Sequence, residues 1–415
     1  MSTSPAAGVS SLRRKARRAF EFHDLIYLVG PAGAPNYGDE VITEAWLRYL
    51  ARHRPLATVV VDSGRPSSAN LLLRQANPRA IFVNTLWELM LHAETTTTNP
   101  DVDPERPWEW VADAASRFGV APAEGSGIEL LLRAKTIHLV GGGYVNRVWP
   151  HHVALVAAIA QVSRVTGARA VATGQGLMPP LDGAGQERLL ADIAQFDVFD
   201  VRDRPSRELV AQIGSHTFHG DDAWLSPRLK HPVPRMQTGE VVLCAQSDLT
   251  EDFQRGEATG AEALAGLLTE ILDAWKVPGD KVTVVEAMPG RDMAVPVLMG
   301  DRLAGARTVP FLDLWRDGLP TGRGGTWLST RFHPHLLAAA AGDSGVAIVP
   351  KPDYYGTKHA SLTGIGSRWT VLSGPDAPLP DWPSSGGYSP GDVDAAVADK
   401  RALARELYPS GVRLR

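Results

Sequence analysis

The sequence predicts an α/β protein made of two units, each with a mainly parallel sheet, that face one another across a cleft. Short apolar, β-branched runs alternate with helical stretches along most of the 415 residues. Continuous apolar strands separated by helices are typical of parallel sheets covered on both faces. Between two such series lies Ser226–Gly239, which has three prolines and no periodicity and is therefore interpreted as a linker.

The first unit is predicted to span residues 1–228, with the linker over 229–240. Its expected strands are Leu25–Gly30, Ala57–Asp62, Arg79–Val83, Lys135–Val140, Arg169–Thr173 and Asp197–Val201. Its expected helices are Asp39–Leu50, His151–Val165, Gln186–Ala194 and Ser206–Ile213.

The second unit, predicted over residues 241–375, repeats this alternation. Its expected strands are Val241–Gln246, Lys281–Ala287, Thr326–Thr330, Val346–Val349 and Trp369–Leu372. Its expected helices lie near Gly260–Trp275, Asp292–Ala304 and Phe332–Ala341. The remaining residues, 376–415, include a predicted helix over Gly391–Tyr408, capped at Ser389 or Asp392, which could pack back on the first unit.

Composition excludes several classes of protein. The 42 Lys and Arg against 46 Asp and Glu leave a formal net charge of −4, so we expect no nucleic-acid partner. The single cysteine, Cys244, can form neither an internal disulfide nor a cysteine-rich metal site and should lie in a buried strand. The sequence has no run of about 18 apolar residues, so no transmembrane helix is predicted. The basic segment 13–18 lacks the apolar core of a signal peptide, so a cytoplasmic location is expected. The sequence does not indicate the oligomeric state.

The candidate binding residues follow the predicted strands, because ligands of such sheets bind beyond the carboxyl ends of the strands. After the first strand, Asn36, Gly38 and Asp39 lie where a helix begins, and its free N–H groups suit an anion. Asp39 could cap that helix, contact a ligand, or do both. The segment has neither the GxGxxG spacing of a dinucleotide site nor the lysine of a P-loop.

Three consecutive glycines follow the fourth strand. They predict a close approach of the backbone to a ligand or to a helix, with Gly142 and Gly143 as contacts. After the fifth strand, Gln175 stands between two glycines and can both donate and accept hydrogen bonds. After the sixth strand, Arg202 would point toward the same crevice, unless it pairs with a neighbouring aspartate or helix cap.

The segment Leu328–His335 holds the most chemically active side chains of the second unit. Arg331 and His333 lie where a strand gives way to an apolar helix, and they form an anion site with a proton donor. His335 is two residues further on, so the two histidines share no helical face and no metal site is expected. Lys358, at the next strand–helix turn, could hold phosphate or be a solvated lysine.

Together these segments resemble the polysaccharide pyruvyl transferase family over most of the chain, from about Ile26 to Leu372. The resemblance rests on seven motifs in order: NYGDE (36–40), GGG (141–143), GQG (174–176), VRDRPS (201–206), GDDAW (220–224), STRFHPH (329–335) and YGTKH (355–359). The family usually has Arg-Leu-His where this chain has Arg-Phe-His, which leaves the charged pair intact. The resemblance implies a GT-B-like architecture of two Rossmann-like units. It also implies transfer of pyruvate from phosphoenolpyruvate onto two hydroxyls of a sugar as a cyclic ketal, with release of phosphate.

The residues fit that chemistry. Phosphoenolpyruvate carries a phosphate and a carboxylate, for which Arg331, Arg202 and Lys358 are the candidate cations. Protonation of its methylene carbon requires a general acid, and His333 is chosen because histidine titrates near neutral pH. Asp39 would orient or deprotonate an acceptor hydroxyl. The other expected substrate contacts are Asn36, Gly38, Gly142, Gly143, Gln175 and His335. The first unit would bind the saccharide acceptor and the second the donor, and no step needs a metal or a redox cofactor.

Two questions stay open. The insert Thr95–Ala123, with Trp108 and Trp110, is either a packed excursion of helical turns or a lid that lines the acceptor. The function has two alternatives, a GT-B glycosyltransferase that uses a sugar nucleotide and a non-catalytic saccharide- or anion-binding protein. The glycosyltransferase would need a nucleoside pocket in the second unit, where no acidic residue is evidently placed for a ribose. The binding protein would not need both His333 and Arg331.

Overall fold

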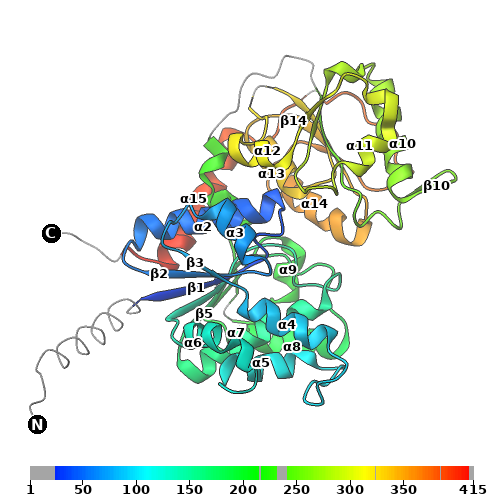
Figure 1. Ribbon diagram of the computed structural model, residues 1–415. Coiled ribbons are helices and arrows are strands. Elements are labelled where there is room, and N and C mark those ends of the chain that lie inside the picture. Colours follow the sequence, from blue (N-terminus) through cyan, green and yellow to red (C-terminus); the bar gives the residue numbers. More distant parts are fainter. Residues whose placement is uncertain (1–23, 215, 231–240, 323, 384, 411–415) are drawn as a thin grey trace, which may run out of the picture.

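The computed structural model describes residues 24–214, 216–230, 241–322, 324–383 and 385–410. The basic segment 13–18 and all but the first two residues of the predicted linker 229–240 lie outside the described residues. In the described part, two α/β units lie against one another, and each has helices on both sides of a central sheet (Figure 1).

The first sheet has seven strands, all parallel, in the order β3-β2-β1-β4-β5-β6-β7. The strands are β1 Leu25–Val29, β2 Thr58–Asp62, β3 Ile81–Val83, β4 Thr136–Leu139, β5 Arg169–Gln175, β6 Val198–Val201 and β7 His216–Phe218. The six predicted strands are present. The edge strand β7 was not predicted, because three residues of mixed polarity form no apolar run.

The helices of this unit are α2 Tyr37–His53, α3 Pro66–Leu73, α4 Thr85–Thr95, α5 Pro107–Ser116, α6 Gly125–Leu132, α7 Val153–Thr166, α8 Gly183–Ile193 and α9 Arg204–Leu209. Helix α5 lies inside the insert and packs against α4 and α7. Its Trp108 and Trp110 are only 9% and 8% exposed and belong to the hydrophobic core. The insert is therefore a packed excursion, and its interpretation as a lid is wrong.

The second sheet has six parallel strands in the order β12-β11-β8-β13-β14-β15. They are β8 Val241–Cys244, β11 Val282–Val285, β12 Arg307–Val309, β13 Thr326–Ser329, β14 Ser344–Ile348 and β15 Thr370–Leu372, beside a small antiparallel pair of β9 Gln254–Arg255 and β10 Ala258–Thr259. The short edge strand β12 was not predicted. Cys244 is fully buried in β8, as expected. The predicted α/β class with two mainly parallel sheets is confirmed.

The helices of the second unit are α10 Gly260–Ala274, α11 Ala294–Met299, α12 Phe311–Asp317, α13 Phe332–Ala340 and α14 Thr357–Gly364. The helix predicted over Asp292–Ala304 is shorter than expected. It ends at Gly300, whose φ of 53° lies outside the right-handed helical region. No helix in the described ranges is both long and apolar enough to cross a bilayer.

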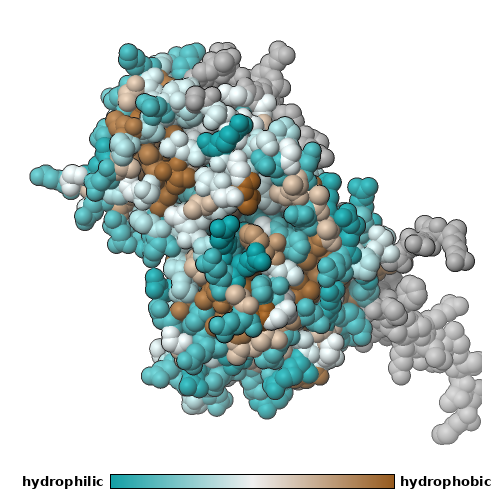
Figure 2. Space-filling view, turned by 180° about the vertical axis from the view of Figure 1, so that it is seen from behind, coloured by the Kyte–Doolittle hydropathy of each residue, from teal (hydrophilic) through white to brown (hydrophobic). Residues whose placement is uncertain are grey.

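The two units share one hydrophobic core and are joined by hydrogen bonds. The core includes Trp46 of α2 and Trp327 of β13. The Tyr354 hydroxyl donates to the carbonyl of Gly143 across the boundary at 2.8 Å. On the face seen in Figure 2, the surface is mainly hydrophilic, with apolar side chains gathered in separate patches on both units.

The last helix, α15 Pro390–Leu407, returns to the first unit and lies beside α2 (Figure 1). Its N-cap is Ser389, one of the two predicted candidates, and the cap is a full capping box with Asp392. Leu403 on its inner face is buried in the shared core, and Tyr408 just beyond its end packs edge-on against Trp46.

We expect Ser389→Ala to lower the free energy of unfolding by about 1 kcal/mol, because it removes the acceptor for a backbone N–H in the first turn of α15. Urea denaturation followed by circular dichroism measures this change. Ser67→Ala, in the exposed first turn of α3, is the control and should change stability by less than about 0.5 kcal/mol. Equal stability of the two variants would contradict the assigned cap.

Candidate active site at the boundary of the two sheets

A pocket of about 360 Å³ lies where the carboxyl ends of both sheets meet. The first unit contributes residues that follow β1, β2, β4 and β6, and the second unit contributes residues that follow β8, β11, β13 and β14. Seven predicted site residues line it: Asn36, Asp39, Gly143, Arg202, Arg331, His333 and Lys358.

The turn from β1 into α2 supplies the acidic side of the pocket. Asn36 caps α2, its side-chain oxygen accepting from the N–H of Gly38 at 3.2 Å. Gly38 lies against the imidazole of His333, since a β-carbon there would be only 1.7 Å from Nδ1. Burial raises the pKa of Asp39, although His333, Lys358 and Arg202 act in the opposite direction. A carboxylate in this environment is a better base than an exposed one.

Two cations from different units meet at Gly143. A β-carbon on this glycine would lie 2.3 Å from Arg202 Nη2 and 3.1 Å from Lys358 Nζ. Burial, with the charge of Arg202 as a second cause, lowers the pKa of Lys358 well below its ordinary value. The lysine ammonium lies 3.5 Å from the centre of the Tyr354 ring and forms no ion pair within the described residues. The pocket thus holds positive charge that the protein itself only partly neutralises.

Asp221 connects the cationic side of the pocket with His333. It accepts from Arg202 Nη1 at 3.2 Å, and its other oxygen is 3.4 Å from His333 Nε2, an ion-pair distance longer than an ordinary hydrogen bond. Burial alone would raise the pKa of Asp221, but His333 and Arg202 outweigh it and hold the pKa below its usual range. One buried carboxylate therefore orients both a cation and the histidine.

Arg331 lies in the pocket with its charge already paired. Its guanidinium donates to Asp292 through Nε at 2.9 Å and to Asp248 through Nη2 at 2.7 Å. The pKa of Asp292 is raised by burial, against the influence of Arg331. Arg331 is therefore less available to an anionic ligand than Lys358, in contrast to its leading place in the sequence-based prediction. Arg202 is also paired, with Asp221 at 3.2 Å and with the neighbouring Asp203 at 3.8 Å, which was the alternative left open for it.

Four predicted contacts do not line the pocket: Gly38, which packs against His333, and three that lie away from the cavity. Gln175 is fully buried, and its amide nitrogen donates to main-chain carbonyls at the ends of β4 and β5, including that of Val140 at 2.9 Å. His335 is also fully buried, because it faces inward from α13 and stacks on Trp369 with ring centroids 4.3 Å apart. At Gly142 a β-carbon would collide with the ring of Tyr144 rather than face the cavity. We do not include these three residues in the site.

Several pocket residues were missed by the sequence analysis. Asp221, which contacts Arg202 and His333 without lining the pocket itself, lies in a motif that supported the family resemblance without receiving a role. Asp248, which does line the pocket, follows β8 in an otherwise featureless loop. Trp87, Trp149 and Tyr354 form an aromatic side of the pocket. A search for aspartate and tryptophan just beyond strand ends could have found most of them. Across the described residues, no three His, Cys, Asp or Glu side chains group as metal ligands.

Comparisons with known proteins agree with this architecture. The chain resembles S. aureus MnaA in its co-structure with UDP (TM-score 0.51, 11% identity, 93% of this chain and 89% of that one). It also resembles the UDP-GlcNAc 2-epimerase from Neisseria meningitidis bound to UDP-GlcNAc (TM-score 0.49, 9% identity, 93% of this chain and 93% of that one). A third similar structure is the UDP-GlcNAc 2-epimerase from Methanocaldococcus jannaschii (TM-score 0.49, 10% identity, 93% of this chain and 99% of that one). At such identities the likeness concerns the GT-B-like fold alone.

No curated protein matches the chain. The family model of the polysaccharide pyruvyl transferases matches residues 36–269, more than half of the sequence. The match begins at Asn36 and includes Asp39, Gly143 and Arg202 of the pocket, whereas the residues contributed by α13 and α14 lie beyond it. The chain belongs to the polysaccharide pyruvyl transferase family.

Proposed function

We propose that this transferase moves the pyruvyl group of phosphoenolpyruvate onto two hydroxyls of a saccharide or glycoside, giving a cyclic ketal and phosphate. The observation that carries the proposal is the meeting of Arg202 and Lys358 at Gly143, in the same pocket as His333 and Asp39. Incompletely neutralised cations beside a proton donor suit a substrate that is both highly anionic and activated by protonation.

The phosphate of the donor would bind between Arg202 and Lys358. Both cations approach the main chain of Gly143, where the absence of a side chain leaves room for them. A dianion placed there relieves the repulsion between the two like charges. The donor carboxylate would then face the first turn of α13, where backbone N–H groups favour an anion and Arg331 lies alongside.

The reaction itself needs one acid and one base. His333 gives a proton to the methylene carbon of phosphoenolpyruvate, which leaves an oxocarbenium-like centre at C2. An acceptor hydroxyl adds to C2 while Asp39 takes its proton. Phosphate then departs with the electrons of the C2–O bond and takes the proton from Asp39. The second hydroxyl closes the ring as it gives its own proton to His333, which restores the acid. No metal or redox cofactor takes part in these steps.

The acceptor would bind on the aromatic side of the pocket. Trp87 and Trp149 line it from the first unit, and Tyr354 packs edge-on against Trp149 from the second. Flat apolar rings can cover the C–H face of a sugar while polar groups meet its hydroxyls. We therefore propose a neutral sugar ring as the reacting part of the acceptor.

Mass spectrometry tests the reaction directly. Candidate saccharides and glycosides are incubated with phosphoenolpyruvate and the enzyme, and a product with the added pyruvyl mass together with released phosphate supports the proposal. Thermal shifts with phosphoenolpyruvate, UDP-sugars and GDP-sugars discriminate the alternatives. Stabilisation by nucleotide sugars alone would favour a glycosyltransferase, and stabilisation by phosphoenolpyruvate without turnover of any acceptor would favour a binding protein.

We expect His333→Ala to reduce kcat roughly 100-fold or more, because it removes the general acid. The Kd for phosphoenolpyruvate should change only a few-fold, since the cations remain. Kinetics of phosphate release and isothermal titration calorimetry measure the two effects. His92→Ala, at an exposed helix position remote from the pocket, is the matched control and should leave both unchanged. Full activity of His333→Ala would remove this residue as the acid.

Gly38→Ala should also reduce kcat strongly while the protein stays folded. The added methyl group would meet the imidazole of His333 at 1.7 Å, so the ring must turn away from Asp221. Gly266→Ala, on the exposed face of α10 where a β-carbon meets nothing within 4 Å, is the control. It should keep full activity and gain slightly in stability. Equal kcat values for the two variants would show that the position of the His333 ring does not affect catalysis.

Binding of phosphoenolpyruvate should take up protons at alkaline pH, where the ligand itself is fully ionised. The free enzyme holds Lys358 with a lowered pKa, so part of it is neutral there, and a bound dianion favours the charged form. Affinity should accordingly fall as the pH rises through the lowered pKa. Calorimetry in buffers of different ionisation enthalpy measures the uptake. Lys358→Met should weaken binding and abolish the uptake, and persistence of the uptake in this variant would contradict the assignment.

A further inference from the structure

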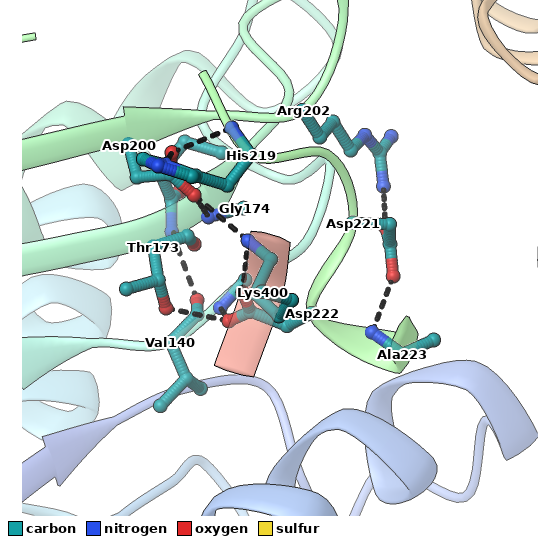
Figure 3. Close-up of polar contacts among 12 residues, drawn as sticks. Val140, Thr173, Gly174, Asp200, Arg202, His219, Asp221, Asp222, Ala223 and Lys400 are labelled. Carbon is teal, nitrogen blue, oxygen red and sulfur yellow. Dashed lines mark hydrogen bonds and ion pairs between the residues drawn. The ribbon is translucent and has the colours of Figure 1, made fainter. Parts of the chain in front are cut away.

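The last helix of the chain places a lysine beneath the pocket. Lys400 of α15 is fully buried, and its ammonium group donates to Asp200 at 2.8 Å and to Asp222 at 3.0 Å. Asp200 belongs to β6, and Asp222 lies in the turn that follows β7. Figure 3 shows the ammonium group between the two carboxylates. Lys400 lies outside the pocket and touches no proposed substrate.

Asp222 fixes the conformation of its turn. One carboxylate oxygen meets Lys400, and the other accepts from Trp46 Nε1 at 2.8 Å and from the N–H of Gly141 at 3.0 Å. The surrounding main chain is tightly packed, since a β-carbon at Gly141 or Gly174 would lie 2.8 Å from this carboxylate. Gly141, the first of the three consecutive glycines, and Gly174 thus accommodate Asp222.

The neighbouring residue, Asp221, faces the other way. Its carboxylate accepts from the N–H of Ala223 at 2.8 Å and meets Arg202 and His333 at the pocket. In Figure 3, Asp221 and Asp222 lie on opposite sides of one turn, the first directed at Arg202 and the second at Lys400. Any shift of the Asp222 carboxylate therefore moves the carboxylate that orients the proposed acid and anion-binding arginine.

The charge of Lys400 is what keeps both buried carboxylates in place. Burial alone would lower the pKa of Lys400, yet Asp200 and Asp222 outweigh it and raise the pKa above its ordinary value. Without the ammonium group, two carboxylates would share one buried site, where like charges force one of them to take up a proton or to move. Asp200 has further donors in the N–H groups of Gly174 and His219. Asp222 also keeps donors in Trp46, Gly141 and Thr173, but all three meet one oxygen, and the oxygen that faces Lys400 would lose its ammonium partner.

We propose that Lys400 is a positioning residue of the active site: by holding Asp222 it fixes the turn from which Asp221 orients Arg202 and His333. The inference rests on the proposed function for its effect on catalysis, but the link between Lys400 and the turn does not depend on it. A lysine that served only to anchor α15 would affect stability without altering the kinetic constants of the folded enzyme.

The test compares Lys400→Met, which keeps much of the side-chain volume without the charge, with Leu403→Ala, which weakens the packing of the same helix. Asp222→Asn is a second variant in case Lys400→Met does not fold. Each is studied well below its melting temperature by two methods. Hydrogen–deuterium exchange of peptides covering residues 219–226 is measured without substrate, and kcat and the KM for phosphoenolpyruvate are measured with a saccharide acceptor.

In folded Lys400→Met we expect faster exchange over residues 219–226, a kcat lower by roughly 100-fold and a several-fold higher KM, because both His333 and Arg202 lose their common partner. Leu403→Ala should melt earlier but keep wild-type exchange in this turn and a wild-type KM. Asp222→Asn should resemble Lys400→Met, and the double variant should be no worse than either single one.

Wild-type exchange in the turn of Lys400→Met, or of Asp222→Asn if the former does not fold, would overturn the inference. So would kinetic losses in Leu403→Ala that equal those of Lys400→Met. A wild-type enzyme that does not turn over phosphoenolpyruvate would instead refute the proposed function. The exchange of the turn would still decide whether Lys400 positions Asp221.

Discussion

Two adjacent aspartates on one turn connect the buried core of the first unit with the pocket. Asp222 accepts hydrogen bonds from Lys400, from Trp46 of α2 and from the N–H of Gly141 after β4. Asp221, on the pocket side of the turn, contacts Arg202 and His333. Each is fully enclosed, so each requires positively charged or N–H partners. The geometry of the pocket therefore depends on a short segment whose two carboxylates satisfy different parts of the protein.

The positive charges of the pocket differ in how far the protein neutralises them. Arg331 is balanced by Asp292 and Asp248, and it ties the first turn of α13 to the loops after β8 and β11. Arg202 has Asp221 at 3.2 Å and Asp203 at 3.8 Å, whereas Lys358 has no carboxylate within ion-pair distance among the described residues. Placing the lysine beside Arg202 without a carboxylate partner of its own lowers stability, a pattern expected where a protein is arranged for an anionic ligand rather than for its own folding.

Much of the fold could be predicted from the sequence, because buried parallel strands are continuous apolar runs. The edge strands β7 and β12 could not, since each is a three-residue run of mixed polarity, unlike the apolar edge strand β3. For the site, residues that follow strands were found, but the inward orientation of His335 depends on packing against Trp369. Lys400 had no local signal at all, because its partners are 178 and 200 residues away in the chain.

The return of α15 makes the first unit discontinuous in sequence. Residues 24–230 form its sheet and most of its helices, but the ammonium group that balances Asp200 and Asp222 comes from residues 390–407, after the whole second unit. In chain order, the second unit is thus an insertion into the first. A fragment that ends at residue 228 would contain Asp200 and Asp222 without Lys400, so we expect the boundary suggested by the linker not to delimit an independently folding domain.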